Sequence, residues 1–415
     1  GNFGLIKTIS NTTFTLAIVS LFNFLLVALI ANYMGESGVA TMGLIVLGVS
    51  FIVMINNLVG GSALVYLTSR APLLSILIVS YSWSVVSTLL MGLVLWLFEL
   101  VPAKFLCWTM AIGLLECIFS IHNQVFIGKE KIKTHNGLKL IQKIAQVTMF
   151  VALGITLENF VLALVISYLT TLIFSFIGVS KQLNSLEICG LPNVFISAFK
   201  YGFQIQLSNI VQLMNYRLLY FYIEKSMVGA LGIFIVAVQV SASLWIPSKA
   251  LAIIQYGKIS NETNERKKAD LTVSFLHLSF LITALAIIAL WLVPNAWILD
   301  LFGKDISGTK PIIYGLSLGV MAVALSQSFS HYLSGVGKYS YLIVGASLGL
   351  LPIVFSGNYV VLNYGLSGAA LLTSISYVVS SAYLGIVFYL QSGLTLKEIL
   401  LSKTNLTQSI ALLKK

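Results

Sequence analysis

The sequence predicts an all-α polytopic membrane protein of about 12 transmembrane helices. Of its 415 residues, 58% are hydrophobic and only 9% are charged, whereas about a quarter of the residues of a soluble protein are charged. Apolar runs of about 20 residues, the length that crosses a bilayer's hydrocarbon core, recur from one end of the chain to the other. The net charge of +11 comes from Lys and Arg in short loops between these runs, which is typical of membrane topology. We therefore expect membrane lipid, and no nucleic acid, as a partner.

Charged residues, Gly/Pro clusters and stretches rich in Asn and Ser interrupt the apolar runs. The first run begins near Phe14, and nothing after it has the composition of a soluble domain. The interruptions predict helices over 9–33, 39–67, 73–98, 104–127, 137–156, 159–180, 200–223, 228–254, 270–294, 310–334, 340–363 and 366–391.

The basic residues predict that both termini are cytoplasmic. With the N-terminus inside, 19 of the 24 Lys and Arg residues lie on the inside face. Arg217 lies within a helix, and the outside face holds only Lys104, Lys225, Lys304 and Lys310. Cytoplasmic loops carry the excess of Lys and Arg, so this orientation, with an even number of spans, is favoured.

The loops exclude several kinds of enzyme. The longest, 181–199 and 255–269, are too short for a nucleotide-binding domain, and no Gly-rich phosphate loop with its Lys is present. No large external loop exists to hold a sugar-transferring active site. We therefore expect no enzymatic activity and no cofactor. We also expect no metal site, because the four histidines share no ligand spacing. The three cysteines have no paired spacing and are expected to be free.

A weak internal repeat predicts two halves. The stretch 21–24 (Leu-Phe-Asn-Phe) of the first helix is echoed by 213–216 (Leu-Met-Asn-Tyr) of the seventh, and a Gly-bearing helix follows each. Six helices separate the two equivalent points, so the halves are parallel repeats, which usually enclose a central cavity. The domains expected are an N-terminal six-helix bundle (1–180), a cytoplasmic linker (181–199), a C-terminal six-helix bundle (200–391) and a cytoplasmic tail (392–415).

The seventh predicted helix is unusually polar. One broad face carries Gln206, Asn209, Tyr216, Arg217 and Tyr220, and the nearly opposite face carries Gln204, Ser208, Gln212 and Asn215. A helix that is polar on both sides is not expected to face lipid, so we interpret these residues as the lining of a cavity. The alternative is that Arg217 snorkels to the outer interface while the amides join neighbouring helices.

The fifth predicted helix carries a basic face. Lys139, Gln142, Lys143 and Gln146 follow i, i+3, i+4, i+7 spacing. Two ammonium groups on one face suit a phosphate or pyrophosphate that enters from the cytoplasm. Alternatively, both lysines reach lipid headgroups, since they lie within two turns of the cytoplasmic end. Arg70 and Lys249, at the inner ends of helices two and eight, are weaker candidates of the same kind.

The fourth predicted helix places one carboxyl, that of Glu116, near the middle of the membrane. Ionisable groups inside a bilayer are costly and mark functional sites or buried pairs. A buried carboxyl can take up and release a proton during transport, which makes Glu116 a candidate for ion coupling. The alternative is a structural partner of a basic residue such as Arg217, or a protonated, hydrogen-bonded acid.

Several short motifs, in the expected order along the whole chain, resemble the bacterial polysaccharide (O-antigen) flippases. This family lies within the multidrug/oligosaccharidyl-lipid/polysaccharide exporter superfamily, whose other members share the glycine-rich motifs. The motifs are 33–35 (Tyr-Met-Gly), 200–209 (Lys-Tyr-Gly-Phe-Gln-Ile-Gln-Leu-Ser-Asn), 213–217 (Leu-Met-Asn-Tyr-Arg), 231–234 (Leu-Gly-Ile-Phe), 245–247 (Trp-Ile-Pro), 335–339 (Gly-Val-Gly-Lys-Tyr) and 363–370 (Asn-Tyr-Gly-Leu-Ser-Gly-Ala-Ala).

The resemblance implies two six-helix bundles that form a V-shaped central cavity in the bacterial inner membrane. It also implies alternating access driven by a proton or sodium ion, and an undecaprenyl-pyrophosphate-linked oligosaccharide as substrate. Arg217 stands where members often carry charge, and we expect it to lie deeper in the cavity than Lys139 and Lys143. Amide and aromatic side chains of the seventh helix are then expected to contact the sugars.

Four other functions remain open. A cation-coupled multidrug exporter of the same fold typically carries an acidic residue in the first helix, and none lies between Ile9 and Tyr33. Peptidoglycan-precursor flippases often have two further helices, which are not seen here. A membrane glycosyltransferase needs an external catalytic loop, and a pure scaffold does not explain the deep polar residues.

Overall fold

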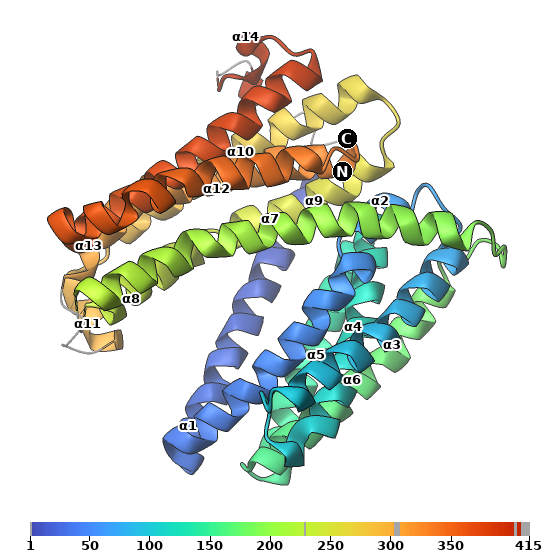
Figure 1. Cartoon of the computed structure of the whole chain (residues 1–415). Helices are drawn as coiled ribbons and strands as arrows, with labels where there is room; N and C mark the ends of the chain where they lie inside the picture. The colour runs from blue at the N-terminus through green and yellow to red at the C-terminus, as the bar shows by residue number, and fades with distance from the viewer. Residues whose placement is uncertain (1, 228–229, 303–307, 402–404, 408–415) are drawn as a thin grey trace. The chain divides into compact units, whose positions relative to one another are not determined.

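The computed structural model describes residues 2–227, 230–302, 308–401 and 405–407, and some side chains within its helices, those of Tyr216 and Arg217 included, lie outside the described part. All regular secondary structure in these ranges is helical (Figure 1). The chain divides into two compact units. The N-unit comprises residues 10–206, and the C-unit comprises Leu207 onward together with the first residues through Ile9.

The N-unit contains six helices and the first part of a seventh. They are α1 (Asn2–Gly60), α2 (Ala63–Leu67), α3 (Leu73–Leu97), α4 (Ala103–Gly128), α5 (Ile132–Leu153), α6 (Leu157–Ser180) and the first 16 residues of α7 (Leu191–Ser226).

Local sequence explains why the middle helices start where they do. Pro72 and Pro102 have extended backbones, with ψ of 131° and 133°, and α3 and α4 begin at the next residue. Thr156 is the N-cap of α6, because its side chain accepts a hydrogen bond from the backbone N–H of Asn159. Gly154, with a positive φ of 101°, ends α5. The predicted helices 73–98, 104–127 and 159–180 are therefore confirmed to within a few residues.

The first two predicted helices form one continuous helix. The predicted break between residues 33 and 39 is wrong as a loop, because α1 is helical over all 59 residues. A straight helix of that length would measure about 88 Å, roughly three times the hydrocarbon thickness. Figure 1 shows that α1 instead doubles back near its middle, so the expected reversal takes place within helical backbone.

The core of the N-unit lies among α1, α3, α4 and α6. It contains the fully buried side chains of Ile52, Ile76, Ile112 and Phe126. α4 packs against α3, α5 and α6, and α5 packs against α6. This arrangement turns the polar faces of α4 and α5 toward α1 and α6.

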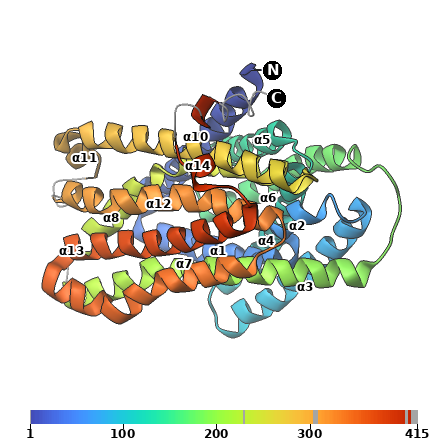
Figure 2. The ribbon, with the colours of Figure 1, turned by 90° about the horizontal axis from the view of Figure 1, so that it is seen from above.

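The C-unit contains the rest of α7 and seven further helices. They are α8 (Leu231–Ser243), α9 (Ile246–Asn261), α10 (Glu265–Leu292), α11 (Asn295–Phe302), α12 (Thr309–Gly335), α13 (Ser340–Ser392) and α14 (Leu396–Ile399). α12 lies between α10 and α13 and also packs against α8 and α9 (Figure 2).

Two predicted boundaries differ from the structure, one in each unit, and a third falls where it was expected. The predicted helix 228–254 is divided into α8 and α9 at Leu244–Trp245, just before Pro247 in the first turn of α9. α7 begins at Leu191, inside the predicted linker 181–199. The predicted break near 364 falls at Gly365, whose φ of 63° and ψ of −148° kink α13 into two lengths.

Within the described residues, seven helical segments are long and apolar enough to cross a membrane. One of them, Thr41–Leu67, covers the second part of α1 and continues through α2. Another is α13, which counts once although its kink at Gly365 divides it into two lengths. The protein is thus an all-helical, multi-pass membrane protein. The exact number of 12 spans stays a prediction, as do the four predicted domains and the cytoplasmic position of the termini.

Candidate functional site

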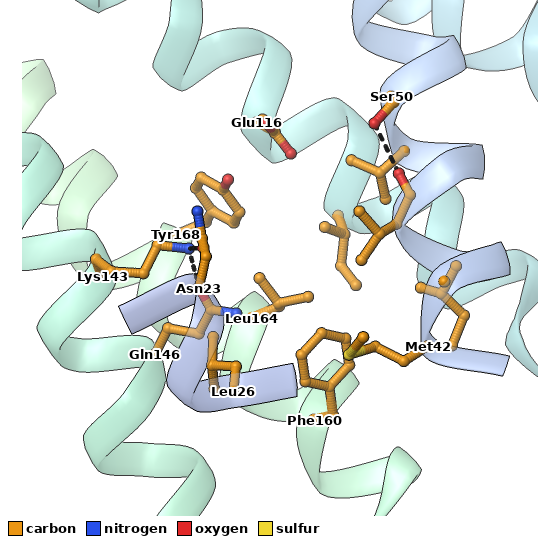
Figure 3. Close-up of a pocket in the computed structure, with 15 residues that line it drawn as sticks. Asn23, Leu26, Met42, Ser50, Glu116, Lys143, Gln146, Phe160, Leu164 and Tyr168 are labelled. Carbon is orange, nitrogen blue, oxygen red and sulfur yellow. Dashed lines mark hydrogen bonds between the residues drawn. The ribbon is translucent and has the colours of Figure 1, made fainter. Parts of the chain in front are cut away.

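A polar pocket of about 370 Å³ lies inside the N-unit. Its polar lining comes from four helices: Asn23 of α1, Glu116 of α4, Lys143 and Gln146 of α5, and Tyr168 of α6. Figure 3 shows these side chains converging on one space. The rest of the lining is largely apolar and includes Leu26, Met42, Ile45, Val49, Ile112, Phe160 and Leu164.

The ammonium group of Lys143 is held by two amide oxygens. Its Nζ donates to Oδ1 of Asn23 at 2.7 Å and to Oε1 of Gln146 at 2.9 Å. A lysine ammonium has three N–H donors. The third has no hydrogen-bond partner within the part of the chain that the structure describes.

Glu116 supplies the negative charge of the pocket. Its carboxyl group interacts electrostatically with the Tyr168 hydroxyl and with the ammonium group of Lys143. The two charges do not form a direct ion pair, because their atoms are more than 4.0 Å apart. The pocket therefore contains a separated acid and base, and a charged or polar ligand group can lie beside either one.

Lys139 lies one helical turn before Lys143 on α5 and is half-buried. Among the described residues, no hydrogen bond or ion pair is formed by its ammonium group, and the titratable group with which it interacts electrostatically is the imidazole of His135. Burying an unpaired ammonium is unfavourable. Lys139 therefore lacks the counter-ion that a purely structural lysine in this position requires.

The neighbouring amides of α5 are already used within the bundle. The side-chain nitrogen of Gln142 donates to Oγ of Ser167 at 3.1 Å, and that of Asn136 donates to Oγ1 of Thr12 at 2.7 Å. These contacts fix the rotation of α5 against α1 and α6. The predicted polar face of α5 is thus turned inward, with its lysines directed into the unit.

The other predicted site residues do not line this pocket. Arg70 is exposed after α2, where its guanidinium lies 3.7 Å from the centre of the Tyr66 ring and donates to the Tyr66 carbonyl at 2.8 Å. Lys249 is exposed on α9. Gln206 is buried, and its side-chain nitrogen donates to the Met54 carbonyl at 3.1 Å.

The predicted residues of α7 beyond Gln206 belong to the C-unit. Asn209 and Gln212 are exposed, whereas Asn215 is buried and its Oδ1 has no hydrogen-bond partner among the described atoms. The side chains of Tyr216 and Arg217 lie outside the described part of the chain. Binding by any of these residues stays a prediction.

Sequence patterns do not identify Asn23 and Tyr168 as polar members of the pocket. Asn23 belongs to the internal repeat, although an amide inside an apolar run is itself a signal of a polar contact. Tyr168 gives no such signal, because tyrosine is common in apolar helices and its partner Glu116 lies 52 positions away.

Comparisons with known proteins identify the fold. The chain resembles the Vibrio cholerae MATE transporter VcmN in its bent form, with a TM-score of 0.78, 11% sequence identity, and coverage of 94% of this chain and 98% of that one. It also resembles a MOP superfamily transporter from Pyrococcus furiosus, with a TM-score of 0.76, 14% identity, and coverage of 100% and 97%. The MATE transporter ClbM in complex with Rb⁺ gives a TM-score of 0.68 at 14% identity, with coverage of 98% and 97%.

No family model and no curated protein matches the sequence. At these identities the likeness to solved structures concerns the fold alone. The chain has the fold of MATE transporters of the MOP superfamily, which is the superfamily that its sequence motifs resemble.

Proposed function

We propose that this protein is a flippase that moves an undecaprenyl-pyrophosphate-linked oligosaccharide across the bacterial inner membrane. The glycan is an O-antigen or a similar repeat unit, and transport is by ion-coupled alternating access without covalent chemistry. The fold supports a membrane transporter, since the solved structures of this fold are transporters. The polysaccharide substrate is supported by the sequence motifs and by the charges inside the N-unit.

The observation that carries the proposal is the pair of lysines on α5. Lys139 has no anionic partner among the described residues, and Lys143 retains one N–H donor that no described atom accepts. Inside a membrane protein such groups favour an anionic ligand. A pyrophosphate satisfies both, since ammonium groups bind phosphate as point charges.

In the proposed cycle the pyrophosphate meets Lys139 and Lys143 first, with Arg70 and Lys249 as further cytoplasmic contacts. It then passes to Arg217, while the lipid tail stays in the bilayer. Gln206, Asn209, Gln212, Asn215 and Tyr216 of α7 contact the sugars. Glu116 is the proposed coupling residue for a proton or sodium ion, because it is the carboxyl group that lines the pocket.

The main rival is a cation-coupled multidrug exporter, and the carboxyl of Glu116 favours it as a group able to bind a cation. The fold does not decide between these functions. In the P. furiosus transporter, for example, the polarity of the binding pocket is reversed, and this suggests a different function for that protein. A peptidoglycan-precursor flippase is a third reading, and it shares the pyrophosphate head of the preferred substrate.

Reconstitution in proteoliposomes tests the proposal. We expect the protein to exchange a fluorescent polyprenyl-pyrophosphate oligosaccharide between leaflets, faster with a pH or sodium gradient than without one. Lys143→Gln and Lys139→Gln should each slow exchange by about 10- to 100-fold, because a charge-assisted hydrogen bond contributes roughly 1.5–3 kcal/mol. Arg217→Ala should reduce exchange without lowering the amount of protein.

Lys133→Gln is the matched control, since Lys133 is an exposed lysine of the same helix. It should exchange the glycolipid at the wild-type rate. Movement of cationic drugs without movement of the glycolipid would replace the proposed substrate by that of the multidrug rival.

A further inference from the structure

Residues 392–401, here called the strap, are fastened to the start of α10 within the C-unit. Leu394 of the strap is buried, with 4% of its surface exposed. Arg266 of α10 forms ion pairs with Asp270 of its own helix and with Glu398 of the strap.

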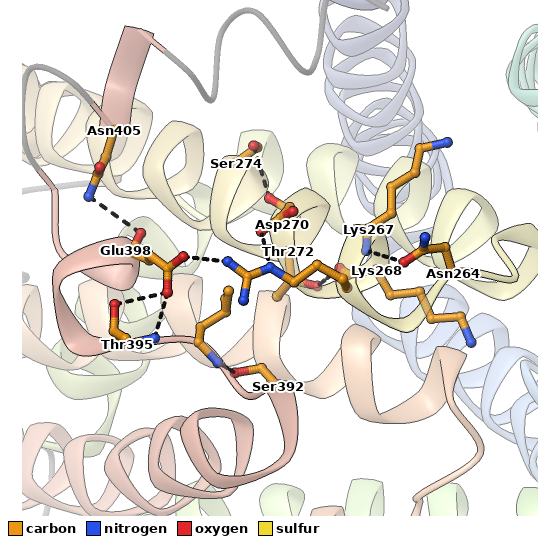
Figure 4. A network of polar contacts seen from close by, with 12 residues as sticks. Asn264, Lys267, Lys268, Asp270, Thr272, Ser274, Ser392, Thr395, Glu398 and Asn405 are labelled. Atoms are coloured by element: carbon orange, nitrogen blue, oxygen red, sulfur yellow. Dashed lines mark hydrogen bonds and ion pairs between the residues drawn. The ribbon is translucent and has the colours of Figure 1, made fainter.

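Two further sets of contacts hold the strap in place. The Nε2–H of His277 donates to the backbone carbonyl of Ile399 at 2.9 Å. The Asn405 amide donates to the carbonyls of Lys397 and Leu400, at 2.5 Å and 2.7 Å. Figure 4 shows Glu398 between Thr395 and the guanidinium group from α10, and Asn405 reaching back to the same turn.

The turn of α14 is itself internally braced. A capping box joins Thr395 and Glu398, with Glu398 Oε2 accepting from the Thr395 backbone at 2.7 Å and from its hydroxyl at 2.8 Å. These two bonds, with that from Arg266, hold the pKa of the Glu398 carboxyl below its usual value. The strap therefore has one fixed orientation on α10.

That orientation directs leucines away from the protein. Leu396 and Leu400 lie one turn apart and are 59% and 62% exposed. Glu398 and Ile399, on the other side of the turn, make the contacts to α10. A water-soluble surface would not be expected to fix two large apolar side chains outward from a braced turn.

Exposed apolar side chains also lie near the end of α13. Ile386 and Leu390, near the end of that candidate membrane span, are 59% and 71% exposed. After the turn at Gly393, exposed apolar side chains occur again at Leu396 and Leu400. Since the exposed apolar side chains of a membrane span face lipid, the strap lies where that lipid-facing surface meets the polar interface.

The exposed cation of the strap itself is Lys397. Arg266 and Lys267 of α10 are paired with carboxylates, Arg266 with Asp270 and Glu398 and Lys267 with Glu262. Lys397, between the exposed leucines, is exposed and forms no ion pair within the described part of the chain. Basic residues beside apolar side chains are typical of segments that lie in the headgroup region of an anionic leaflet.

We propose that the strap is an interfacial anchor, seated on an anionic lipid surface, with Leu396 and Leu400 among the upper acyl chains and Lys397 among the headgroups. This site is independent of the transported substrate. It holds the start of α10 and the end of α13 at the same leaflet. The segment after α13, expected from the sequence to be a cytoplasmic tail, is then bound to the membrane surface.

Site-directed fluorescence in lipid nanodiscs tests the anchor. On a full-length background whose three cysteines are replaced by alanine, Leu396→Cys and Leu400→Cys are labelled with a small fluorophore. We expect lipids spin-labelled near the headgroup to quench both probes and aqueous iodide to leave them protected. Leu390→Cys is the lipid-facing control, and Thr263→Cys, in the exposed α9–α10 turn, is the aqueous control.

Replacing anionic by zwitterionic lipid should reduce the lipid quenching at residue 400, and Lys397→Gln should remove most of that dependence. Probes at 396 and 400 that respond like the Thr263→Cys probe would overturn the anchor. So would spontaneous disulfide-linked dimers of Leu400→Cys, which would identify a second copy of the chain as the occupant.

A measurement on the unaltered protein keeps the test valid if a cysteine variant fails to fold. Hydrogen exchange of the strap amides should slow when anionic lipid is added to zwitterionic nanodiscs, with no matching change in the α9–α10 turn. Equal exchange in both lipids would contradict the proposal.

Discussion

Two polar side chains, those of Ser175 and Tyr81, fix the protonation of the buried His122 in the N-unit. Nδ1 of His122 lies 2.6 Å from Oγ of Ser175, and its Nε2 lies 2.5 Å from the Tyr81 hydroxyl. The Ser175 hydroxyl donates to the Leu172 carbonyl at 3.1 Å, so its oxygen accepts from His122. The proton of the neutral imidazole is therefore on Nδ1, and Nε2 accepts from Tyr81.

This assignment predicts the effect of Tyr81→Phe. The change removes the donor to Nε2 and leaves a buried acceptor unsatisfied, which should lower stability by about 1–3 kcal/mol. Unfolding of the purified protein by a denaturing detergent measures the difference. Ser82→Ala is the control, because Ser82 is exposed and bonds only within its own helix. Equal stability of the two variants would show that the Tyr81–His122 contact contributes nothing.

At the level of single residues, the sequence predicted the pocket in part. The i, i+3, i+4, i+7 spacing on α5 identified Lys143 and Gln146, and the depth of Glu116 in its run identified the acid. Periodicity assigns residues to a face of their own helix but does not reveal what a neighbouring helix presents. Tyr168 was missed for this reason, and Arg70 was not expected to stack on Tyr66.

Close contact between α12 and α13 depends on small residues. Gly315 and Gly319 are four positions apart on α12 and face Ala370 and Ser374 of α13. The backbone N–H of Gly319 donates to Oγ of Ser374 at 3.0 Å. Small residues at this spacing allow membrane helices to approach closely.

We therefore expect Gly319→Ala to separate the two helices. An added Cβ would lie 2.9 Å from Cα of Ser374, which is backbone and cannot rotate away. The overpacking should cost about 1–3 kcal/mol in the same unfolding assay. Gly137→Ala is the matched control, since a Cβ there meets nothing within 4 Å. It should be neutral or slightly stabilising because alanine favours helix; a stable Gly319→Ala would mean that α13 can shift.

Helix boundaries were predictable where local chemistry sets them and not elsewhere. Pro72 and Pro102 start α3 and α4 as expected. The break before Pro247 was missed because the apolar run continues through it, although a proline lacks the N–H that an uninterrupted helix needs. The strap was missed because its fixed conformation depends on Arg266 and His277, more than 100 residues earlier in the chain.

For the whole molecule, composition predicted the all-helical membrane fold, and the structure confirms it together with its likeness to MATE transporters. A fold shared at 11–14% identity leaves the substrate to be read from individual side chains. The orientation in the membrane is a property of the whole chain as well, because it depends on the summed distribution of Lys and Arg over every loop.

A native cysteine tests this orientation. Cys189 is exposed in the connection between α6 and α7, and its backbone N–H donates to Oγ of Ser75 at 3.0 Å, which holds it beside the first turn of α3. That end of α3 follows Arg70 and is cytoplasmic if the basic residues mark the inside. A membrane-impermeant maleimide should therefore label Cys189 in inverted vesicles and not in intact cells.

Two other positions provide the comparison. Cys117 is buried and should not react from either side. Lys104→Cys, on a background without native cysteines, lies at the opposite end of the bundle, where Lys104 pairs with Glu158 at the start of α6, and it should label in intact cells. Since each Lys or Arg in a loop favours retention inside, the reverse labelling pattern would require 19 of the 24 basic residues to lie outside. It would also place the basic ends of α5 and α10 on the wrong side of the membrane to receive a substrate made in the cytoplasm, so the proposed direction of transport would have to be abandoned.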